Sequence, residues 1–262
     1  MGLLNNFLGK KNSQSLFERL YRLSLRGMNY GRASDYQHNG EAAMLERISG
    51  MIKSDAPVLF DVGANKGEFT KHILESWKGR QIRLYVFEPS QKTYAMLKAA
   101  IPASDSVRLV NKGLGDKEGK VELYYDREGS GLASVYPRDL SYHNINFSDH
   151  ETIELTTLDR FCEQNKIEAI DFLKLDVEGH ELSVLRGGKK MFDEGRIKMV
   201  QFEFGGCNID SRSFFRDYFN FFKADYDLYR ILSDGLRPIT SYSEKLEVFL
   251  SANYLAIRKS VD

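Results

Sequence analysis

The chain has 262 residues, enough for one large domain with a substantial buried core. Its 37 Lys and Arg balance 37 Asp and Glu, so the formal net charge of +0 gives no general attraction for a polyanion such as nucleic acid. Hydrophobic residues at 42% exclude a mainly disordered chain, and the two separate cysteines, Cys162 and Cys207, exclude a disulfide scaffold and argue against a structural zinc site.

The N-terminal region predicts neither a membrane span nor a targeting signal. No apolar run approaches the roughly 20 residues that cross a bilayer. The first apolar patch is too short for a signal peptide, and its charges follow it rather than precede it. Asn6 stands where a myristoylation motif needs Ser or Thr. We therefore expect a cytoplasmic protein in a reducing environment.

Residues 1–56 are expected to form a helical extension, and residues 57–262 the main domain. Apolar residues recur at helical spacing between residues 13 and 53, with a loop at 27–31. The extension is locally basic through Lys10, Lys11, Arg19, Arg22 and Arg26. Such a stretch is typical of a solvated helix face, with a nucleic-acid or membrane contact, or contact between copies of the chain, as alternatives.

From Pro57 onward, short apolar runs alternate with helical stretches. Strands are expected at 58–62, 82–88, 107–111, 170–176 and 197–204. This alternation is typical of a doubly wound α/β fold, in which helices cover both faces of a mostly parallel sheet. Segments 119–125 and 151–156 alternate like half-exposed strands, and strands near 228–232 and 249–257 predict an antiparallel C-terminal hairpin.

Two further segments carry polar or aromatic side chains in quantity. The long polar loop 126–150 is expected to be a lid over a bound substrate, or else a solvated insertion. Its candidate contact residues are Ser130, Gly131, Ser134, Tyr136, Arg138, Tyr142 and His143. The aromatic stripe between Phe214 and Phe222 is expected to pack in the core or at a partner interface.

The turn after the first strand predicts a nucleotide site. Asp61 and the segment Gly63-Ala64-Asn65-Lys66-Gly67 lie between a strand and a helix, where glycine lets backbone N–H groups approach a ligand. No Gly-Lys-Ser/Thr follows, which excludes a P-loop, and the spacing departs from G-x-G-x-x-G. The turn therefore suits a nucleoside without a pyrophosphate. Asp61 holds the turn or lies near a cationic ligand.

An acid follows the second strand. Glu88 lies about twenty residues beyond the glycine turn, where the corresponding acid of dinucleotide-binding folds accepts hydrogen bonds from ribose hydroxyls. Its combination with Asp61, Gly63 and Gly67 is a strong signal for a ribose-binding site.

Five segments in this order resemble the FkbM family of class I, Rossmann-like S-adenosylmethionine-dependent methyltransferases. They are VLFDVGANKGEFT at 58–70, YVFEPS at 85–90, NKGLGDKEGKVELYY at 111–125, TTLDRF at 156–161 and DFLKLDVEGHELSVLRGG at 171–188. The resemblance implies a seven-stranded methyltransferase sheet and methyl transfer from S-adenosyl-L-methionine to a hydroxyl of a small molecule or a sugar precursor.

The resemblance also implies roles for individual residues. Gly63, Asn65, Gly67 and Thr70 would surround the methionine end of the cofactor, and Glu88 would hold the ribose. The adenine would lie against Gly113, Leu114, Gly115 and Asp116. Asp116 either receives the adenine amino group or only forms a turn.

The reaction centre is expected beyond the fourth parallel strand. Asp176, Glu178 and His180 share one direction if the chain stays extended, and Glu203 ends the neighbouring strand. A hydroxyl acceptor needs a base, and His180 and Glu178 are equal candidates, with Asp176 near the methionine amino group or the methyl. In the alternative, none of these side chains has a catalytic role. His180 then caps the following helix or lies on its solvated face, and Asp176 and Glu178 hold the turn between strand and helix. Lys174 is then a partner in a structural ion pair, and Glu203 has no role in the site.

Two alternatives stay open. A hard divalent cation on Asp176, Glu178, Glu203 and His180 is less favoured than a metal-free site, so no metal is assigned. N-methylation on the same fold, or a nucleoside-binding subunit without turnover, would also suit this sequence.

Overall fold

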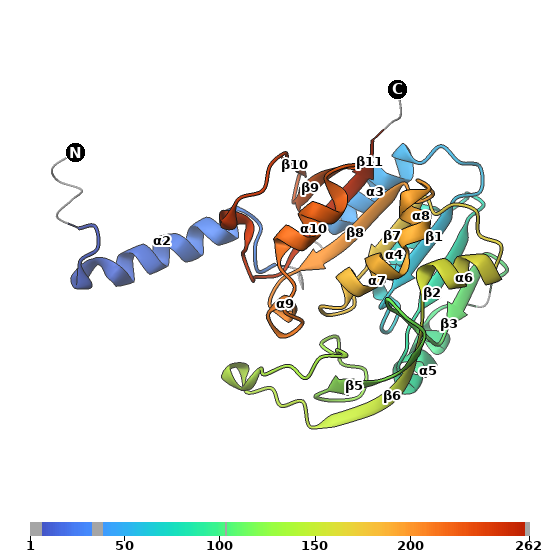
Figure 1. Ribbon diagram of the computed structural model, residues 1–262, viewed down its shortest axis with the longest axis horizontal. Helices are drawn as coiled ribbons and strands as arrows, with labels where there is room; N and C mark the ends of the chain where they lie inside the picture. Colours follow the sequence, from blue (N-terminus) through green and yellow to red (C-terminus); the bar gives the residue numbers. More distant parts are fainter. Residues whose placement is uncertain (1–6, 33–38, 103, 260–262) are drawn as a thin grey trace.

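The chain forms two β-sheets with helices packed against the larger one (Figure 1). The computed structural model describes residues 7–32, 39–102 and 104–259. The larger sheet has eight strands in the order β10-β9-β11-β8-β7-β1-β2-β3. Its strands are β1 (Val58–Val62), β2 (Arg83–Phe87), β3 (Val107–Val110), β7 (Phe172–Leu175), β8 (Met199–Phe204), β9 (Tyr226–Leu232), β10 (Gly235–Ile239) and β11 (Ala252–Arg258).

The smaller sheet has three strands in the order β4-β6-β5. They are β4 (Gly113–Leu114), β5 (Gly119–Tyr125) and β6 (Asp149–Thr156). The α-helices are α2 (Gln14–Gly27), α3 (Glu41–Met51), α4 (Glu68–Ser76), α5 (Gln91–Ala100), α6 (Leu158–Gln164), α7 (Glu181–Gly187), α8 (Lys189–Asp193), α9 (Cys207–Asp210) and α10 (Phe215–Phe222). Short 3-10 helices are η1 (Lys11–Ser13), η2 (Ser141–His143) and η3 (Glu244–Leu246).

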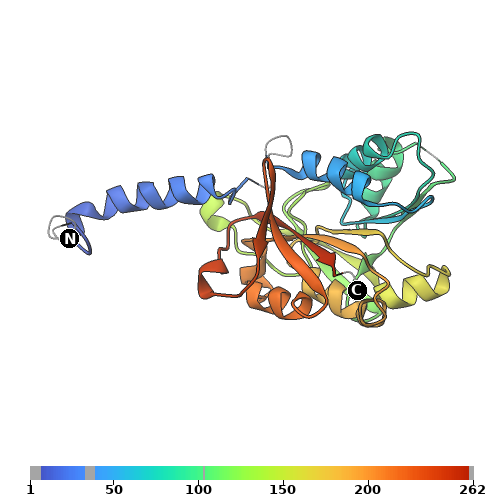
Figure 2. The same ribbon diagram turned by 90° about the horizontal axis from the view of Figure 1, so that it is seen from above.

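Helices lie on both faces of the larger sheet (Figure 2), and two clusters of buried apolar side chains pack between the sheet and these helices. Successive side chains of a strand point to opposite faces, and in β1 Phe60 packs in one cluster while Leu59 packs in the other. Helices α3, α4 and α5 contribute to the cluster of Leu59, whereas α6, α7 and α10 contribute to that of Phe60. Every residue of β1 is buried, as expected for a parallel strand covered on both sides.

The predicted doubly wound α/β fold is confirmed, with one strand more in the main sheet. The parallel strands pair in the order β3-β2-β1-β7-β8, and β11 runs antiparallel between β8 and β9. The two predicted C-terminal strands do pair with each other, but β10 lies between them in sequence and makes the hairpin with β9. The sequence did not predict β10 because Gly235 and Pro238 weaken its strand signal, which an edge strand tolerates.

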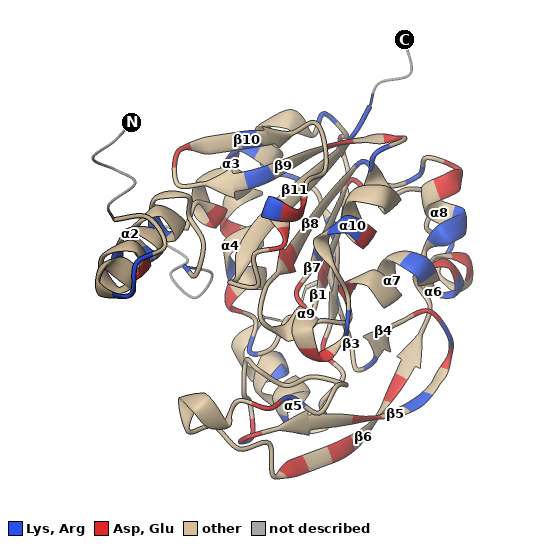
Figure 3. Ribbon diagram, turned by 60° about the vertical axis from the view of Figure 1, so that its left-hand side comes forward, with Lys and Arg blue, Asp and Glu red and all other residues tan. Residues whose placement is uncertain are grey.

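The segments 119–125 and 151–156 form strands as predicted, but outside the main sheet. β5 and β6 pair antiparallel and β4 adds to β6 in parallel. Most of the aromatic stripe packs in the core, since Phe215, Tyr218 and Phe222 are fully buried, whereas Phe214 is 48% exposed. Charges of both signs are spread over helices and strands, without one broad basic face in the view of Figure 3.

The two N-terminal helices differ in their packing. α3 places Met44, Leu45 and Ile48 in the core, and Gly40 before it lies so close to β9 that a Cβ would be 2.0 Å from the Leu232 carbonyl oxygen. α2 instead extends away from the sheets (Figures 1 and 2). None of the helices in the described ranges is both long and apolar enough to cross a membrane.

Candidate active site

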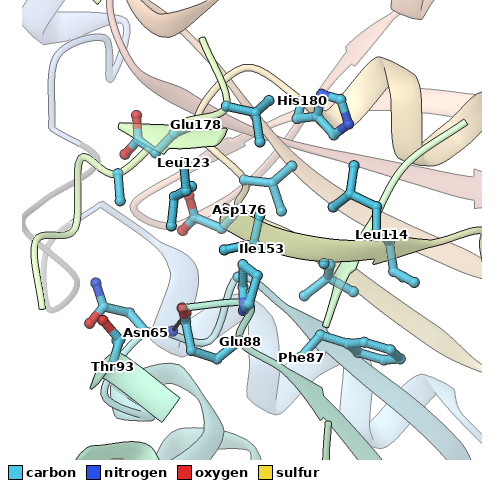
Figure 4. A pocket seen from close by; sticks show the side chains of 18 of the residues that line it. Asn65, Phe87, Glu88, Thr93, Leu114, Leu123, Ile153, Asp176, Glu178 and His180 are labelled. Atoms are coloured by element: carbon cyan, nitrogen blue, oxygen red, sulfur yellow. Dashed lines mark hydrogen bonds between the residues drawn. The ribbon is translucent and has the colours of Figure 1, made fainter. Parts of the chain in front are cut away.

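A cavity opens at the carboxyl ends of β1, β2 and β7, the edge where open α/β sheets bind ligands. It has an empty volume of about 640 Å³, part of it open to solvent. Asn65 and Glu88 lie on one side of it, Glu178 and His180 on the other, with Asp176 between them (Figure 4). The smaller sheet closes the remaining wall.

The glycine turn after β1 adopts the backbone conformation that the sequence predicts. Gly63 has φ +84°, and a Cβ there would lie 1.8 Å from the Asp176 carbonyl oxygen. Only glycine fits such a close approach. Asn65 is also left-handed, with φ 49°. Its Nδ2 donates to the Ser130 carbonyl at 3.0 Å, while its buried Oδ1 has no hydrogen-bond partner in the described part of the chain.

Glu88 is a buried carboxylate that faces this turn. It accepts hydrogen bonds from the backbone N–H of Asn65 at 3.0 Å and of Ser90 at 2.9 Å. Burial raises the pKa of Glu88 to about 7, although these two hydrogen bonds act to lower it. A carboxylate oxygen has more than one lone pair, so the group can still accept from two ribose hydroxyls.

Asp61 and Thr70 form the structural support below the turn. The Thr70 hydroxyl donates to Asp61 Oδ2 at 2.5 Å, and both side chains are buried. Burial raises the pKa of Asp61 to about 6, against the effect of the Thr70 hydrogen bond. Gly67 begins α4 with φ +84° and packs against Leu97 and Ile101. These three residues hold the turn and do not line the cavity.

An apolar floor extends the cavity toward the smaller sheet. Gly113 and Leu114 of β4 line it, as the resemblance predicts for an adenine-binding segment. Leu123, Ile153 and Leu155 of β5 and β6 add to it, and sequence reasoning missed them. In the sequences of β5 and β6, these apolar residues alternate with charged ones, and this pattern was the signal that could have revealed an apolar face. Asp116 is exposed and Gly115 packs beside His180, so neither lines the cavity.

Glu178 lies in the loop between β7 and α7. Its backbone is left-handed, with φ 50°, and its Oε2 accepts from Arg138 at 2.5 Å. The Arg138 side chain is only 7% exposed and also approaches Asp210 at 3.6 Å. Burial, together with Asp176, raises the pKa of Glu178 to about 8, and Arg138 acts in the opposite direction.

Glu181 holds this loop from below and was not among the predicted site residues. Its Oε1 accepts from the backbone N–H of Val177 at 2.9 Å and of Gly179 at 3.3 Å. The Tyr218 hydroxyl approaches its Oε2 at 3.4 Å. Glu181 is therefore a buried side chain that fixes the backbone of this loop. Burial raises its pKa to about 7. Nothing in the local sequence distinguishes it from a surface acid of a helix.

His180 points toward the apolar floor rather than toward Glu178 (Figure 4). Its Nδ1 lies 3.0 Å from the Tyr136 hydroxyl, and its Nε2 is buried without a partner among the described residues. Burial lowers the pKa of His180 to about 4, so the ring is neutral near pH 7.

Asp176 and Lys174 form a charged group at the end of β7. Lys174 Nζ lies 3.3 Å from Asp176 Oδ2 and 3.3 Å from Glu41 Oε1, which is the structural ion pairing that the sequence left open. Burial favours a lower pKa for Lys174, but Asp176, Glu41 and Glu203 outweigh it and raise the pKa above its usual range. Burial, followed by the repulsion from Asp176 and Glu178, raises the pKa of Glu203.

The loop 126–150 crosses the cavity and contacts the side on which Glu178 and His180 lie. Ser134 Oγ donates to the Glu178 carbonyl at 2.7 Å, Tyr136 reaches His180, and Arg138 pairs with Glu178. Ser130 and Gly131 line the cavity. Tyr142 is instead exposed at the loop's far end. The loop therefore covers the site and supplies side chains to it.

A second cleft continues from the cavity on the side of α4. The two share Gly63, Asn65, Gly131 and Asp176. The cleft is further lined by Glu41, Ala64, Lys66, Glu68, Phe69, His72, Arg127, Gly129 and Lys174. A ligand in the first cavity and a second molecule in this cleft would meet at Asp176.

Within the described ranges, no group of three or more His, Cys, Asp or Glu side chains is arranged to hold a metal ion. Asp176, Glu178 and Glu203 are near enough to affect one another's charge, but Arg138 and Lys174 already occupy two of these carboxylates.

These features define an α/β enzyme of the nucleoside-binding, class I methyltransferase type. The sheet order, the glycine turn after β1 and the acid after β2 are all in place. The model of the Methyltransferase FkbM domain matches residues 61–228, and the chain belongs to this family of methyltransferases.

Relatives with a curated name are methyltransferases as well. The 2-O-methyltransferase NoeI of Sinorhizobium fredii is 26% identical over 168 residues, covering 60% of this chain and 67% of NoeI. The hexuronic acid methyltransferase AglP of Haloferax volcanii is 28% identical over 149 residues, covering 56% of each chain. A crystal structure of an FkbM methyltransferase from Methylobacillus flagellatus has a TM-score of 0.48 at 17% identity, covering 79% of this chain and 45% of that one.

The residues present fit S-adenosylmethionine. Asn65 Oδ1 is a buried acceptor to which no described residue donates, and it is suited to the donor hydrogens of an ammonium group. Gly63 has no side chain, so a ligand can approach the backbone there closely. The apolar floor of the cavity suits a purine ring.

Proposed function

We propose that the protein transfers a methyl group from S-adenosylmethionine to a hydroxyl of a small molecule or a sugar precursor. The observation that carries this proposal is Glu178, a partly buried carboxylate, 17% exposed, with a raised pKa, which faces the cavity beside Asp176. A hydroxyl must lose its proton as it is methylated, and Glu178 supplies a base for it. The names of NoeI and AglP, a 2-O-methyltransferase and a hexuronic acid methyltransferase, agree with such an acceptor.

In this proposal the cofactor lies across the carboxyl ends of β1, β2 and β7. Glu88 accepts hydrogen bonds from the ribose hydroxyls, and Asn65 Oδ1 accepts one from the methionine ammonium. Leu114 and Leu123 pack against the adenine. Asp61, Gly67 and Thr70 act indirectly, by holding the turn that positions Asn65.

The acceptor hydroxyl approaches from the second cleft, where Asp176 is shared with the cofactor cavity. Bound S-adenosylmethionine supplies the methyl group on a sulfonium and leaves as the neutral thioether. Glu178 takes the proton of the acceptor hydroxyl as the new O–CH₃ bond forms. Asp176 and the Arg138 side chain fix the position and charge of this carboxylate.

The geometry favours Glu178 over His180 as the base. His180 has a pKa of about 4 and faces the apolar floor, so it accepts a proton poorly at neutral pH. Glu178 has a pKa of about 8, near the working range of a general base. We assign to His180 the role of positioning the adenine end of the cofactor.

The remaining assignments are parts of the same proposal. The protein works in the cytoplasm, without a metal and on a small acceptor rather than on nucleic acid. Residues 57–262 form the methyltransferase domain and residues 1–56 an extension. N-methylation would need no general base as strong as Glu178, and a binding subunit without turnover would have no use for it.

The test is transfer of a radiolabelled methyl group to pooled monosaccharide and oligosaccharide acceptors, with an amine pool beside them. Alkali-stable product from the hydroxyl pool, lost in Glu178→Gln, is expected. Product from the amine pool alone would replace O-methylation by N-methylation. Binding of S-adenosylhomocysteine without product from either pool would favour the binding subunit.

A further inference from the structure

Helix α2 presents a leucine face to solvent. Only Leu25 of its 14 residues is buried, and the helix extends away from the sheets in two perpendicular views (Figures 1 and 2). Leu16, Leu20 and Leu23 are 53%, 47% and 67% exposed. Their spacing of four and three residues puts them on one side of the helix. Phe7 and Leu8, which precede it, are exposed as well.

The neighbouring side of α2 is cationic. Arg19, Arg22 and Arg26 follow one another at the same helical spacing, and within the described part of the chain they form no ion pair. Between residues 9 and 28 there are five cationic side chains and one carboxylate, Glu18, in a chain whose total formal charge is +0. The segment made of α2 and the residues just before it, which include Lys10 and Lys11, is therefore locally basic.

We propose that α2 docks onto the surface of a bilayer that contains anionic lipids. The leucine face enters the boundary between headgroups and acyl chains, and the arginines remain at the level of the lipid phosphates. A helix with one apolar face and one Arg-rich face is suited to this position, because long cationic side chains reach the phosphates while their stems stay apolar.

Charge selects the bilayer over a second copy of this chain. Pairing two α2 helices through their leucines would place two sets of five cations near each other with only one carboxylate in each set. Anionic headgroups bring the opposite charge, at roughly 1 kcal/mol per Lys or Arg near the surface, or about fivefold in binding. Because α2 does not line the methyl-transfer cavity, this proposal stands apart from the proposed function.

The test is sedimentation of the full chain with vesicles of phosphatidylcholine alone or with about one third phosphatidylglycerol. We expect binding to the anionic vesicles, weakened by salt, and little binding to the neutral ones. Leu20→Ser with Leu23→Ser should abolish binding. Arg19→Glu with Arg22→Glu should weaken it about tenfold or more.

Met51→Ser with Leu250→Ser is the matched control, because both side chains are 43% exposed but lie elsewhere on the domain. This variant should bind vesicles like the parent. Circular dichroism and binding of S-adenosylhomocysteine show whether each variant is folded. Equal recovery of the parent with both vesicle types, or with neither, would overturn the proposal. So would a lipid-free dimer that the two leucine substitutions convert to a monomer, because the face would then pair two copies.

Discussion

The cofactor side and the reacting side of the cavity are positioned in different ways. On the cofactor side, Gly63 follows the fully buried strand β1 and Glu88 follows β2, in which only Arg83 is exposed, and Glu88 accepts hydrogen bonds from backbone N–H groups. On the reacting side, Glu178 lies in a loop with a left-handed backbone and depends on Arg138 from a second loop, 40 residues away. Changes on the first side should therefore act on binding or stability, and changes on the second side on turnover and its pH dependence.

The largest effect is expected at Glu178. Glu178→Gln keeps the shape but removes the proton acceptor, so kcat should fall about 10²–10⁴-fold, while the Kd for S-adenosylhomocysteine changes little. His180→Ala is the companion variant, and it should keep kcat within a few fold, because the proposed base is Glu178 and not His180. A kcat loss of equal size in His180→Ala, with unchanged turnover in Glu178→Gln, would exchange the two roles.

A large loss of stability is expected at the glycine turn. A methyl side chain on Gly63 would meet the Asp176 carbonyl oxygen at 1.8 Å in a left-handed backbone. Gly63→Ala should lower the free energy of unfolding by about 2–4 kcal/mol and weaken cofactor binding. Gly79→Ala is the control, because Gly79 has φ +80° but nothing within 4 Å of a Cβ. Denaturant unfolding should show about 1 kcal/mol there, and equal losses at both positions would remove the close approach as the cause.

Glu88 should control cofactor affinity and its pH dependence. Its pKa of about 7 means that the carboxylate is partly protonated near neutrality. Ribose hydroxyls donate to the ionised form, so binding should tighten as pH rises through 7 and level off above it. Glu88→Gln should weaken binding about 10–100-fold and abolish this pH step. Glu75→Gln, on an exposed side chain, is the calorimetric control. An unchanged Kd in Glu88→Gln would refute the ribose contact.

The smallest effect is expected from Arg138, which tunes Glu178 without being the base. Its cation lowers the pKa of Glu178, so Arg138→Gln should move the midpoint of the kcat profile above pH 8 and lower kcat about tenfold at pH 7. Arg138→Lys should recover part of the shift, and Arg160→Gln, at an exposed position, should have no effect. A lower kcat with an unmoved midpoint would mean that Arg138 is only structural.

The sequence predicted the parts of the molecule that depend on neighbouring residues. The apolar runs of β1 and β2, the glycine turn and Glu88 are all readable within a few residues. The edge strand β10, the apolar floor from β5 and β6, and the buried side chain of Glu181 were not predicted. The apolar floor and Glu181 depend on pairing or burial between segments distant in the chain, such as Tyr218 with Glu181, 37 residues apart. The strand β10 was missed for a local reason, because Gly235 and Pro238 weaken its strand signal.

The choice between Glu178 and His180 could not be made from the sequence for the same reason. Their spacing suits an extended chain that places both side chains on one side. The left-handed backbone of Glu178 and Gly179 breaks this pattern and turns the two side chains apart. Only the folded loop, held by Glu181, shows which of them faces Asp176.

Calorimetric titration of S-adenosylhomocysteine into the full chain at pH 8 tests the cofactor site most directly. One molecule bound per chain is expected, and an analogue that lacks both ribose hydroxyls should bind far more weakly. Equal affinity for the two compounds, or no heat from either with folded protein, would contradict a nucleoside site at Glu88.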